Sequence, residues 1–109
     1  MVPVTLVGPG GRITLWGLVD TGAEDVLLAP ARLTVLGLVP LGQTQIDTAG
    51  GAKNELTYQA QILLAGRDLG RLTVVALEPS AEVPLIVGRA VLRFFRLVFD
   101  GPGGTLDLL

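Results

Sequence analysis

The sequence predicts an all-β domain of mostly antiparallel strands, with one short helix near the C-terminal end. Short apolar runs recur along the 109 residues and are separated by turn residues. The cluster Gly-Pro-Gly-Gly occurs twice, at residues 8–11 and 101–104, each time between two strand-like runs. Only residues 89–95 form a convincing helix, short and apolar on one side. A chain of this length forms one domain, so we assign residues 1–109 to a single unit.

The elements of the first half follow from these patterns. Residues 2–7 and 12–19 flank the first Gly-Pro-Gly-Gly turn and predict a hairpin, with Trp16 in the core. Residues 26–28 are apolar and predict a strand. Residues 30–33 begin with proline, which favours a single helical turn.

A long hairpin is predicted in the second half, because the arm that follows its tip alternates cleanly between apolar and polar positions. We expect its strands at residues 43–47 and 54–64, and its tip at residues 48–52. The remaining segments are expected as a turn at 65–70, a strand at 71–77, a polar loop at 78–84, an apolar strand at 85–87 and two short final strands at 97–100 and 105–108. Phe94 and Phe95 are expected in the core.

Composition excludes several classes of function. Eight basic and ten acidic residues are scattered along the chain without a basic stripe, so we expect no nucleic-acid partner. No apolar run is long enough to span a membrane, and the first residues, Met1 to Val4, lack the basic region followed by an apolar region that marks a signal peptide. We therefore expect a cytoplasmic protein without a membrane partner. Half of the residues are hydrophobic, which is apolar for so small a chain and favours an interface with another chain.

Asp20 is the residue that points most directly to chemistry. It follows the apolar run 13–19 and begins a turn that contains glycine. A charged side chain at the end of a buried strand usually has a partner or a function. The chain has no His and no Cys, which excludes His-based triads and Cys nucleophiles. Carboxylates and water therefore remain for hydrolytic chemistry.

Two motifs together resemble the retroviral-type (retropepsin-like) aspartic protease family. The first is Asp-Thr-Gly-Ala-Glu-Asp at residues 20–25, followed by an apolar strand. The second is the apolar-apolar-Gly-Arg segment at residues 86–89, which opens the predicted helix. The motifs, their order and the chain length agree over nearly all 109 residues. The resemblance implies a closed, barrel-like acid protease fold and a hairpin that acts as a flap over the substrate.

The same resemblance implies an aspartic endopeptidase without a metal or an organic cofactor. Its partners would be a second copy of the chain and a peptide or unfolded protein substrate. Hydrolysis by carboxylates requires two of them around one water, whereas each chain supplies one Asp-Thr-Gly motif. A two-fold homodimer would therefore pair Asp20 of both chains as general acid and general base.

Roles for the neighbouring residues also come from the resemblance. Thr21 would bond across the dimer axis, Gly22 would permit the tight turn, and Ala23 would form the floor of the site. Glu24 stands where the family usually has Asp, and it would contact substrate and pair with Arg89, which follows Gly88. The alternatives are a turn-stabilising hydroxyl at position 21 and a solvated guanidinium at position 89.

Further substrate contacts are expected from Asp25 in the cleft and from Ala49, Gly50 and Gly51 at the flap tip. The alternatives are a solvated loop acid at position 25 and an ordinary hairpin turn at the tip. Asp47 is not expected to be catalytic, because no apolar strand delivers it.

One departure from the family concerns the dimer interface. Many members have an additional N-terminal strand there, whereas only about six residues precede the first turn of this chain, and the barrel needs them. The interface would then depend on residues 97–99 and 105–109. The alternative function is a non-catalytic dimerisation or peptide-binding module of the same fold.

Overall fold

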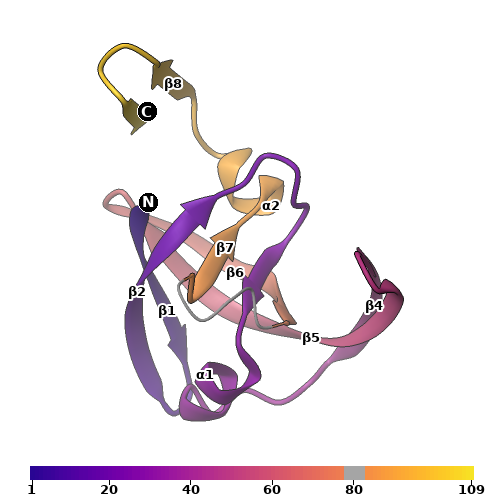
Figure 1. Ribbon diagram of the computed structural model, residues 1–109. Helices are drawn as coiled ribbons and strands as arrows, with labels where there is room; N and C mark the ends of the chain where they lie inside the picture. Colours follow the sequence, from indigo (N-terminus) through magenta and orange to yellow (C-terminus); the bar gives the residue numbers. More distant parts are fainter. Residues whose placement is uncertain (78–82) are drawn as a thin grey trace.

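A six-stranded barrel forms the body of the chain in the computed structural model, which describes residues 1–77 and 83–109 (Figure 1). The strand order is β1-β2-β7-β3-β6-β5, and β5 pairs with β1 to close the barrel, while β4 pairs only with β5. The elements are β1 (Val2–Gly8), β2 (Gly11–Val19), β3 (Val26–Leu28), α1 (Pro30–Val35), β4 (Gly42–Thr48), β5 (Gly51–Leu64), β6 (Arg67–Ala76), β7 (Leu85–Val87), α2 (Arg89–Leu92), β8 (Leu97–Asp100) and β9 (Thr105–Leu108).

Strand β1 closes the barrel because it pairs on both sides. It is antiparallel to β2 over its whole length, from Val2↔Gly17 to Gly8↔Gly11, and antiparallel to β5 from Val4↔Leu64 onward. Two pairings, β2 with β7 and β3 with β6, are parallel, and the others are antiparallel. The predicted mostly antiparallel, closed β fold is confirmed.

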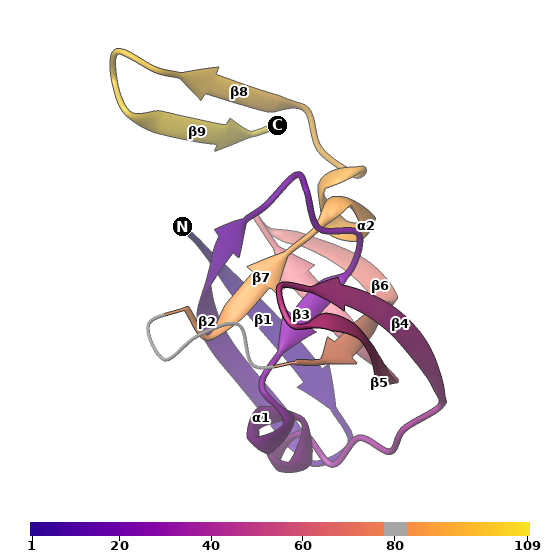
Figure 2. The same ribbon diagram turned by 45° about the vertical axis from the view of Figure 1, so that its right-hand side comes forward.

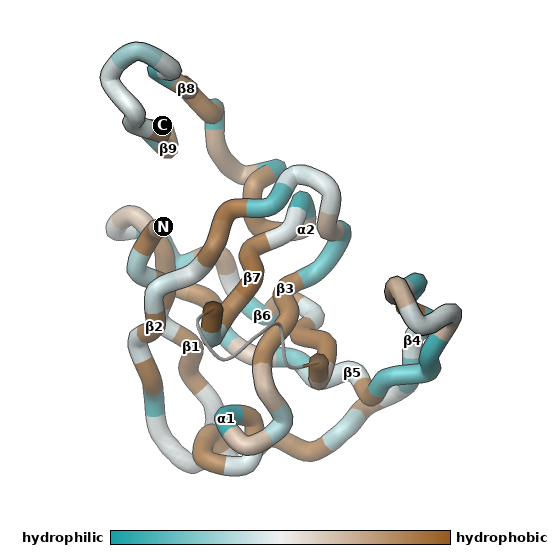
Figure 3. The backbone as a smooth tube through the Cα atoms, in the orientation of Figure 1, coloured by the Kyte–Doolittle hydropathy of each residue, from teal (hydrophilic) through white to brown (hydrophobic). Residues whose placement is uncertain are grey.

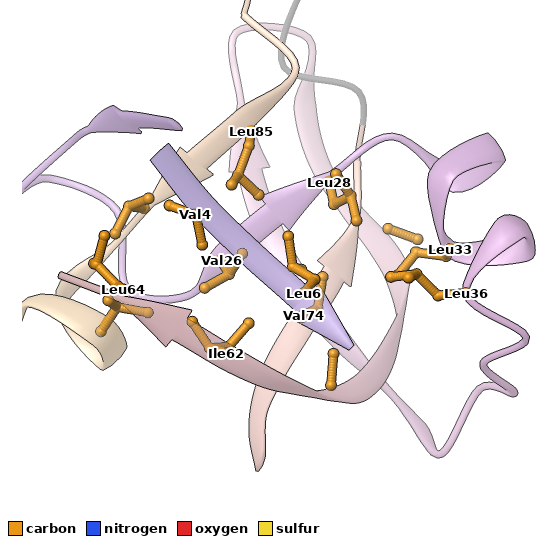
Figure 4. Close-up of a cluster of buried hydrophobic side chains, with 14 of the residues drawn as sticks. Val4, Leu6, Val26, Leu28, Leu33, Leu36, Ile62, Leu64, Val74 and Leu85 are labelled. Carbon is orange, nitrogen blue, oxygen red and sulfur yellow. The ribbon is translucent and has the colours of Figure 1, made fainter. Parts of the chain in front are cut away.

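The core lies inside this barrel and consists of aliphatic side chains from nearly every strand and from α1 (Figure 4). Leu33 and Leu36 from α1 and the turn after it are completely or almost completely buried there. The fully buried side chains include Val4, Leu6, Val26, Leu28, Leu36, Ile62, Val74 and Leu85. This packing holds the short strands β3 and β7 in the sheet.

The β4–β5 hairpin extends from the barrel as an arm and curls back toward the loop that joins the C-terminal end of β2 to the N-terminal end of β3 (Figures 1 and 2). Its outer part is mostly hydrophilic, in contrast to β3 and β7 (Figure 3). The pair Thr48↔Gly51 closes the hairpin with Ala49 and Gly50 at its tip, and Gly51 has φ 108°, a conformation that favours glycine.

The C-terminal hairpin β8–β9 forms a separate two-stranded sheet that projects from the body (Figure 2). Leu97 and Leu108, at its base, pack against the core. Phe99, farther along β8, is 77% exposed.

Several boundaries differ from the sequence-based expectation. The turn predicted at 65–70 is confined to residues 65–66, and β6 begins at Arg67. The expected helical turn at 30–33 is the six-residue helix α1, whereas α2 ends at Leu92 instead of residue 95. Most of the predicted loop 78–84 lies outside the described residues.

The expected core positions of two aromatic residues are wrong. Trp16 is 60% exposed, because it points away from the barrel at an outward position of β2, and Phe94 is 45% exposed. Phe95 is half-buried against the core, and its ring lies 4.9 Å from the Arg67 guanidinium carbon.

Candidate active site

Asp20 directly follows β2, where that strand runs parallel to β7 in the middle of the sheet. Its backbone N–H donates to the carbonyl of Val87 over 3.0 Å, which extends the β2–β7 ladder by one bond. Asp20 is half-buried. The core-packed sheet therefore fixes the backbone that presents this carboxyl group.

The loop after Asp20 is stabilised by its own hydrogen bonds. The Gly22 N–H donates to Asp20 Oδ1 over 2.8 Å, and the Ala23 N–H donates to the Asp20 carbonyl over 3.2 Å. A Cβ atom at Gly22 would lie 3.1 Å from Asp20 Oδ1, which leaves little room for a side chain. These contacts orient one carboxylate oxygen toward the loop, and the other has no hydrogen bond to any residue that the structure describes.

The segment around Gly88 packs directly against this loop. The N–H groups of Arg89 and Ala90 donate to the carbonyls of Ala23 and Glu24 over 2.9 and 2.8 Å. A Cβ atom at Gly88 would lie 2.8 Å from the Ala23 carbonyl and still closer to another backbone oxygen. Glycine is therefore required here by close backbone approach, since the φ of −93° itself is ordinary.

Arg89 supports the loop through a different partner from the one expected. Its Nη1 donates to the Thr21 carbonyl over 2.9 Å. Although both residues are described, no ion pair joins Arg89 to Glu24, which is exposed, so the expected Glu24–Arg89 pair is wrong. The backbone bond from Arg89 to Ala23 places the side chain beside the start of the loop, within reach of a carbonyl that has no partner in the turn.

A cleft of about 410 Å³ lies between this loop and β4. We call it the Asp20 cleft. One wall consists of Asp20 and most of the predicted site residues that follow it, and the other is a segment of the hairpin arm. The lining residues are Asp20, Gly22, Ala23, Glu24, Asp25, Leu27, Thr44, Gln45, Ile46, Asp47 and Arg89.

The structure places other predicted residues outside this cleft. Thr21 is exposed and does not line it. Ala49, Gly50 and Gly51 are exposed at the tip of the arm and do not line it either, so their contact with substrate stays a prediction.

Sequence reasoning missed Leu27, Thr44 and Ile46, which line the cleft. The register of β2, β7 and β3 is the signal that could have identified Leu27. Leu18, Ile86 and Leu27 are adjacent in β2, β7 and β3. Ile86 and Leu27 each lie between two buried residues, and Leu18 lies between a buried residue and a partly buried one. They therefore form an apolar row on the face opposite the core, next to Asp20.

Asp25 is a partly buried carboxyl group in the Asp20 cleft. Partial burial raises the pKa of Asp25, and the nearby Glu24 carboxylate raises it further. Among the described residues, no hydrogen bond or ion pair of its side chain offsets these effects. Asp25 therefore favours its neutral form more than an ordinary surface aspartate does.

Among the described residues, no group of His, Cys, Asp and Glu could hold a metal ion. None of the helices in residues 1–77 and 83–109 is long and apolar enough to cross a membrane.

The closed barrel has the fold of retropepsin-like aspartic proteases of known structure. Residues 2–91 match the sequence profile of the family described as aspartyl protease, which spans most of the chain. This chain belongs to the aspartyl protease family.

Solved structures agree with this assignment. A retropepsin-like aspartic protease from Rickettsia conorii superposes with a TM-score of 0.64 at 18% identity, covering 96% of this chain and 87% of that one. The simian foamy virus (mac) protease gives 0.60 at 18% identity, with 85% and 91% covered. The EIAV protease in complex with the inhibitor HBY-793 gives 0.60 at 26% identity, with 91% and 94% covered. No curated protein sequence matches at a significant level.

Proposed function

We propose that this chain is one subunit of a homodimeric aspartic endopeptidase in which Asp20 of each subunit contacts one shared water. The observation that carries the proposal is the single Asp20 loop, fixed by backbone hydrogen bonds at the edge of a cleft that the β4–β5 arm covers. Peptide hydrolysis by carboxylates needs two carboxyl groups, and a chain that supplies one needs a second copy.

The chemistry divides between the two carboxyl groups. Two carboxylates about 3 Å apart share one proton, so one is ionised and the other is protonated. The ionised group removes a proton from water as the water oxygen bonds to the peptide carbonyl carbon, and the protonated group donates to the carbonyl oxygen. As the C–N bond breaks, the carboxyl group that took the proton from water donates it to the leaving amine. The hydroxyl group formed from the carbonyl oxygen returns its proton to the other carboxylate, which restores the starting pair.

An extended peptide suits this cleft. The apolar row of Leu18, Ile86 and Leu27 offers a surface for a large apolar side chain beside Asp20. The glycines at the arm tip, Gly50 and Gly51, would let backbone approach the substrate closely once the arm closes. We therefore expect cleavage next to apolar residues in flexible or unfolded chains.

The C-terminal hairpin supplies the dimer surface in this proposal. Phe99 lies opposite Leu106 and shares one apolar face with the pair Leu97↔Leu108. The inner pair packs on the core of its own chain, whereas Phe99 projects beyond it and is mostly exposed. A two-stranded hairpin is marginally stable alone, so a second copy that covers Phe99 would complete its packing.

Subunit mixing provides the decisive test. A fixed amount of the wild-type chain is mixed with increasing amounts of Asp20→Asn, and hydrolysis of an unfolded protein is measured after equilibration. If the site is shared, an equal amount of the variant lowers activity to about half, and a ninefold excess lowers it to about one tenth, because mixed dimers are inactive.

The control for mixing is Arg32→Gln, a change at an exposed residue of α1 that does not line the Asp20 cleft. Its addition should raise activity in proportion to its amount. Undiminished activity in the presence of excess Asp20→Asn would contradict a shared site. A wild-type chain that binds unfolded protein without cleaving it would favour the non-catalytic alternative.

A further inference from the structure

A second and larger hollow lies beside the Asp20 cleft, between β6 and α2. Its volume is about 470 Å³, and its lining includes Arg71, Arg89, Arg93, Glu24, Asp25 and Phe94. We call it the arginine groove. Arg89 and Arg93 are four residues apart and face the same side of the α2 segment, and Arg71 comes from β6 on the opposite wall.

The groove adjoins the Asp20 cleft. Glu24, Asp25 and Arg89 line both hollows. A peptide that is bound over Asp20 and leaves the cleft past these three residues therefore reaches the groove. The groove is placed to contact substrate residues at a distance from the scissile bond.

Two of the three guanidinium groups have no partner in residues 1–77 and 83–109. Arg89 donates to the Thr21 carbonyl, whereas the side chains of Arg71 and Arg93 form no hydrogen bond or ion pair in the described structure. Glu24 and Asp25 lie at the end next to the cleft and balance part of the positive charge. Two guanidinium groups facing one hollow offer paired donors for a carboxylate.

We propose that the arginine groove binds an acidic side chain of the peptide substrate, which rests on the proposed function of the Asp20 cleft. Arg71 and Arg93 hold the carboxylate, and the half-exposed ring of Phe94 contacts the apolar stem of the same side chain. A peptide fits better than a nucleic acid, because the groove adjoins the proposed peptide cleft and the chain carries more acidic than basic residues, ten against eight.

Equilibrium binding to the inactive Asp20→Asn chain tests the proposal without relying on turnover. The probes are fluorescent decapeptides with a central Leu-Phe pair and a single Glu at one flanking position, with matched peptides carrying Gln or Lys there. At one or two adjacent positions we expect Glu to bind about three- to tenfold more tightly than Gln, and Lys more weakly than Gln. The Glu preference should shrink as salt concentration rises.

The variant pair assigns the preference to the groove. Arg71→Ala combined with Arg93→Ala should reduce the Gln/Glu ratio of dissociation constants to about one. Arg12→Ala, which removes an exposed arginine that lines neither hollow, should leave that ratio intact. Circular dichroism of each variant verifies the fold.

Three results would overturn the proposal: equal binding of Glu and Gln at every position, a Glu preference that survives the double variant, and competition by inorganic phosphate without any Glu preference. Each of them leaves the proposed proteolysis untouched. Failure of proteolysis would instead appear as undiminished or absent hydrolysis in the subunit-mixing experiment, where the flanking charge plays no part.

Discussion

The Asp20 carboxyl group accepts a hydrogen bond from the Gly22 N–H over 2.8 Å, and an asparagine side-chain oxygen can accept the same bond. Asp20→Asn should therefore keep the fold and the loop while it removes the ionisable group. We expect kcat/KM to fall by about a thousandfold or more. Steady-state kinetics together with circular dichroism measure both effects, and activity that persists in repurified variant protein would move the chemistry to another residue.

Gly88 packs against the backbone of the Asp20 loop so closely that any side chain must displace it. We expect Gly88→Ala to lower the free energy of unfolding by about 1–3 kcal/mol and to reduce activity with it. Gly101→Ala is the matched control, because its Cβ atom would meet only Phe99 at 3.7 Å. Chemical denaturation of both variants at one protein concentration measures the difference, and equal stability of the two would contradict this packing role.

Asp25 gives a prediction about pH. Its pKa is raised in the folded state, so the native chain binds its proton more tightly than the unfolded chain does. The associated stability is fully present below the unfolded pKa and is lost as the pH rises through the folded pKa. The difference in stability between Asp25→Asn and wild type should therefore be more favourable to the variant at neutral pH than at pH 3. Thermal unfolding at both pH values, at constant protein concentration, measures this change, and a pH-independent difference would contradict it.

Sequence alone predicted Asp20 as the central acid because the motif, the preceding apolar strand and the absence of His and Cys all agree. It failed for the Arg89 partner. The family resemblance indicates that Arg89 lies near the Asp20 loop. Whether its guanidinium group donates to the Thr21 carbonyl or to the Glu24 carboxylate depends on local backbone geometry. Because Arg89 and Glu24 are both exposed to solvent, an ion pair between them would add little stability, which favours the Thr21 carbonyl as the acceptor.

The β4–β5 arm shows what the alternation of apolar and polar residues along a strand can predict. The pattern of β5 gave its orientation and placed Ala60 and Ile62 on the buried face. The boundary of β6 was missed, because residues 67–70 carry the polar and glycine residues typical of a turn. A register shift between Gln61 and Leu63 lets β5 pair with this irregular stretch, and such a bulge has no mark in the sequence.

The β8–β9 hairpin yields a prediction about association. Phe99→Ser should weaken the proposed dimer by about tenfold or more, because it removes a large apolar side chain from the surface that the second copy would cover. Val39→Ser is the control, since Val39 is similarly exposed at 69% but lies in the α1–β4 connection. Sedimentation velocity over a concentration series compares the two, and equal dimer affinity would place the interface elsewhere.

At the scale of the whole molecule, the barrel closes through pairings that local sequence patterns do not specify. The hairpins β1–β2 and β4–β5 were predictable because a turn sits between their strands. The parallel pairs β2–β7 and β3–β6 join segments that are far apart in sequence, and their apolar residues fit several partners equally well. The family resemblance supplied the closed fold that patterning alone left open.

A site shared between two copies makes activity depend on concentration. We expect specific activity to rise with protein concentration and to level off when the chain is mostly dimeric, because only the dimer holds both carboxyl groups. Rates per mole of chain, measured across the dissociation range found by sedimentation, test this expectation. A constant specific activity through that range would show that a monomer is sufficient.

The pairing of Val4 in β1 with Leu64 in β5 sets when the barrel can close during synthesis. At about 5–20 residues per second, a ribosome needs roughly 3–12 s to extend the chain from one to the other. During that interval β1 has no second neighbour, and its inward side chains, Val4 and Leu6, stay accessible until the core forms around them. The nascent β1–β2 hairpin therefore exposes apolar side chains until β5 has been made.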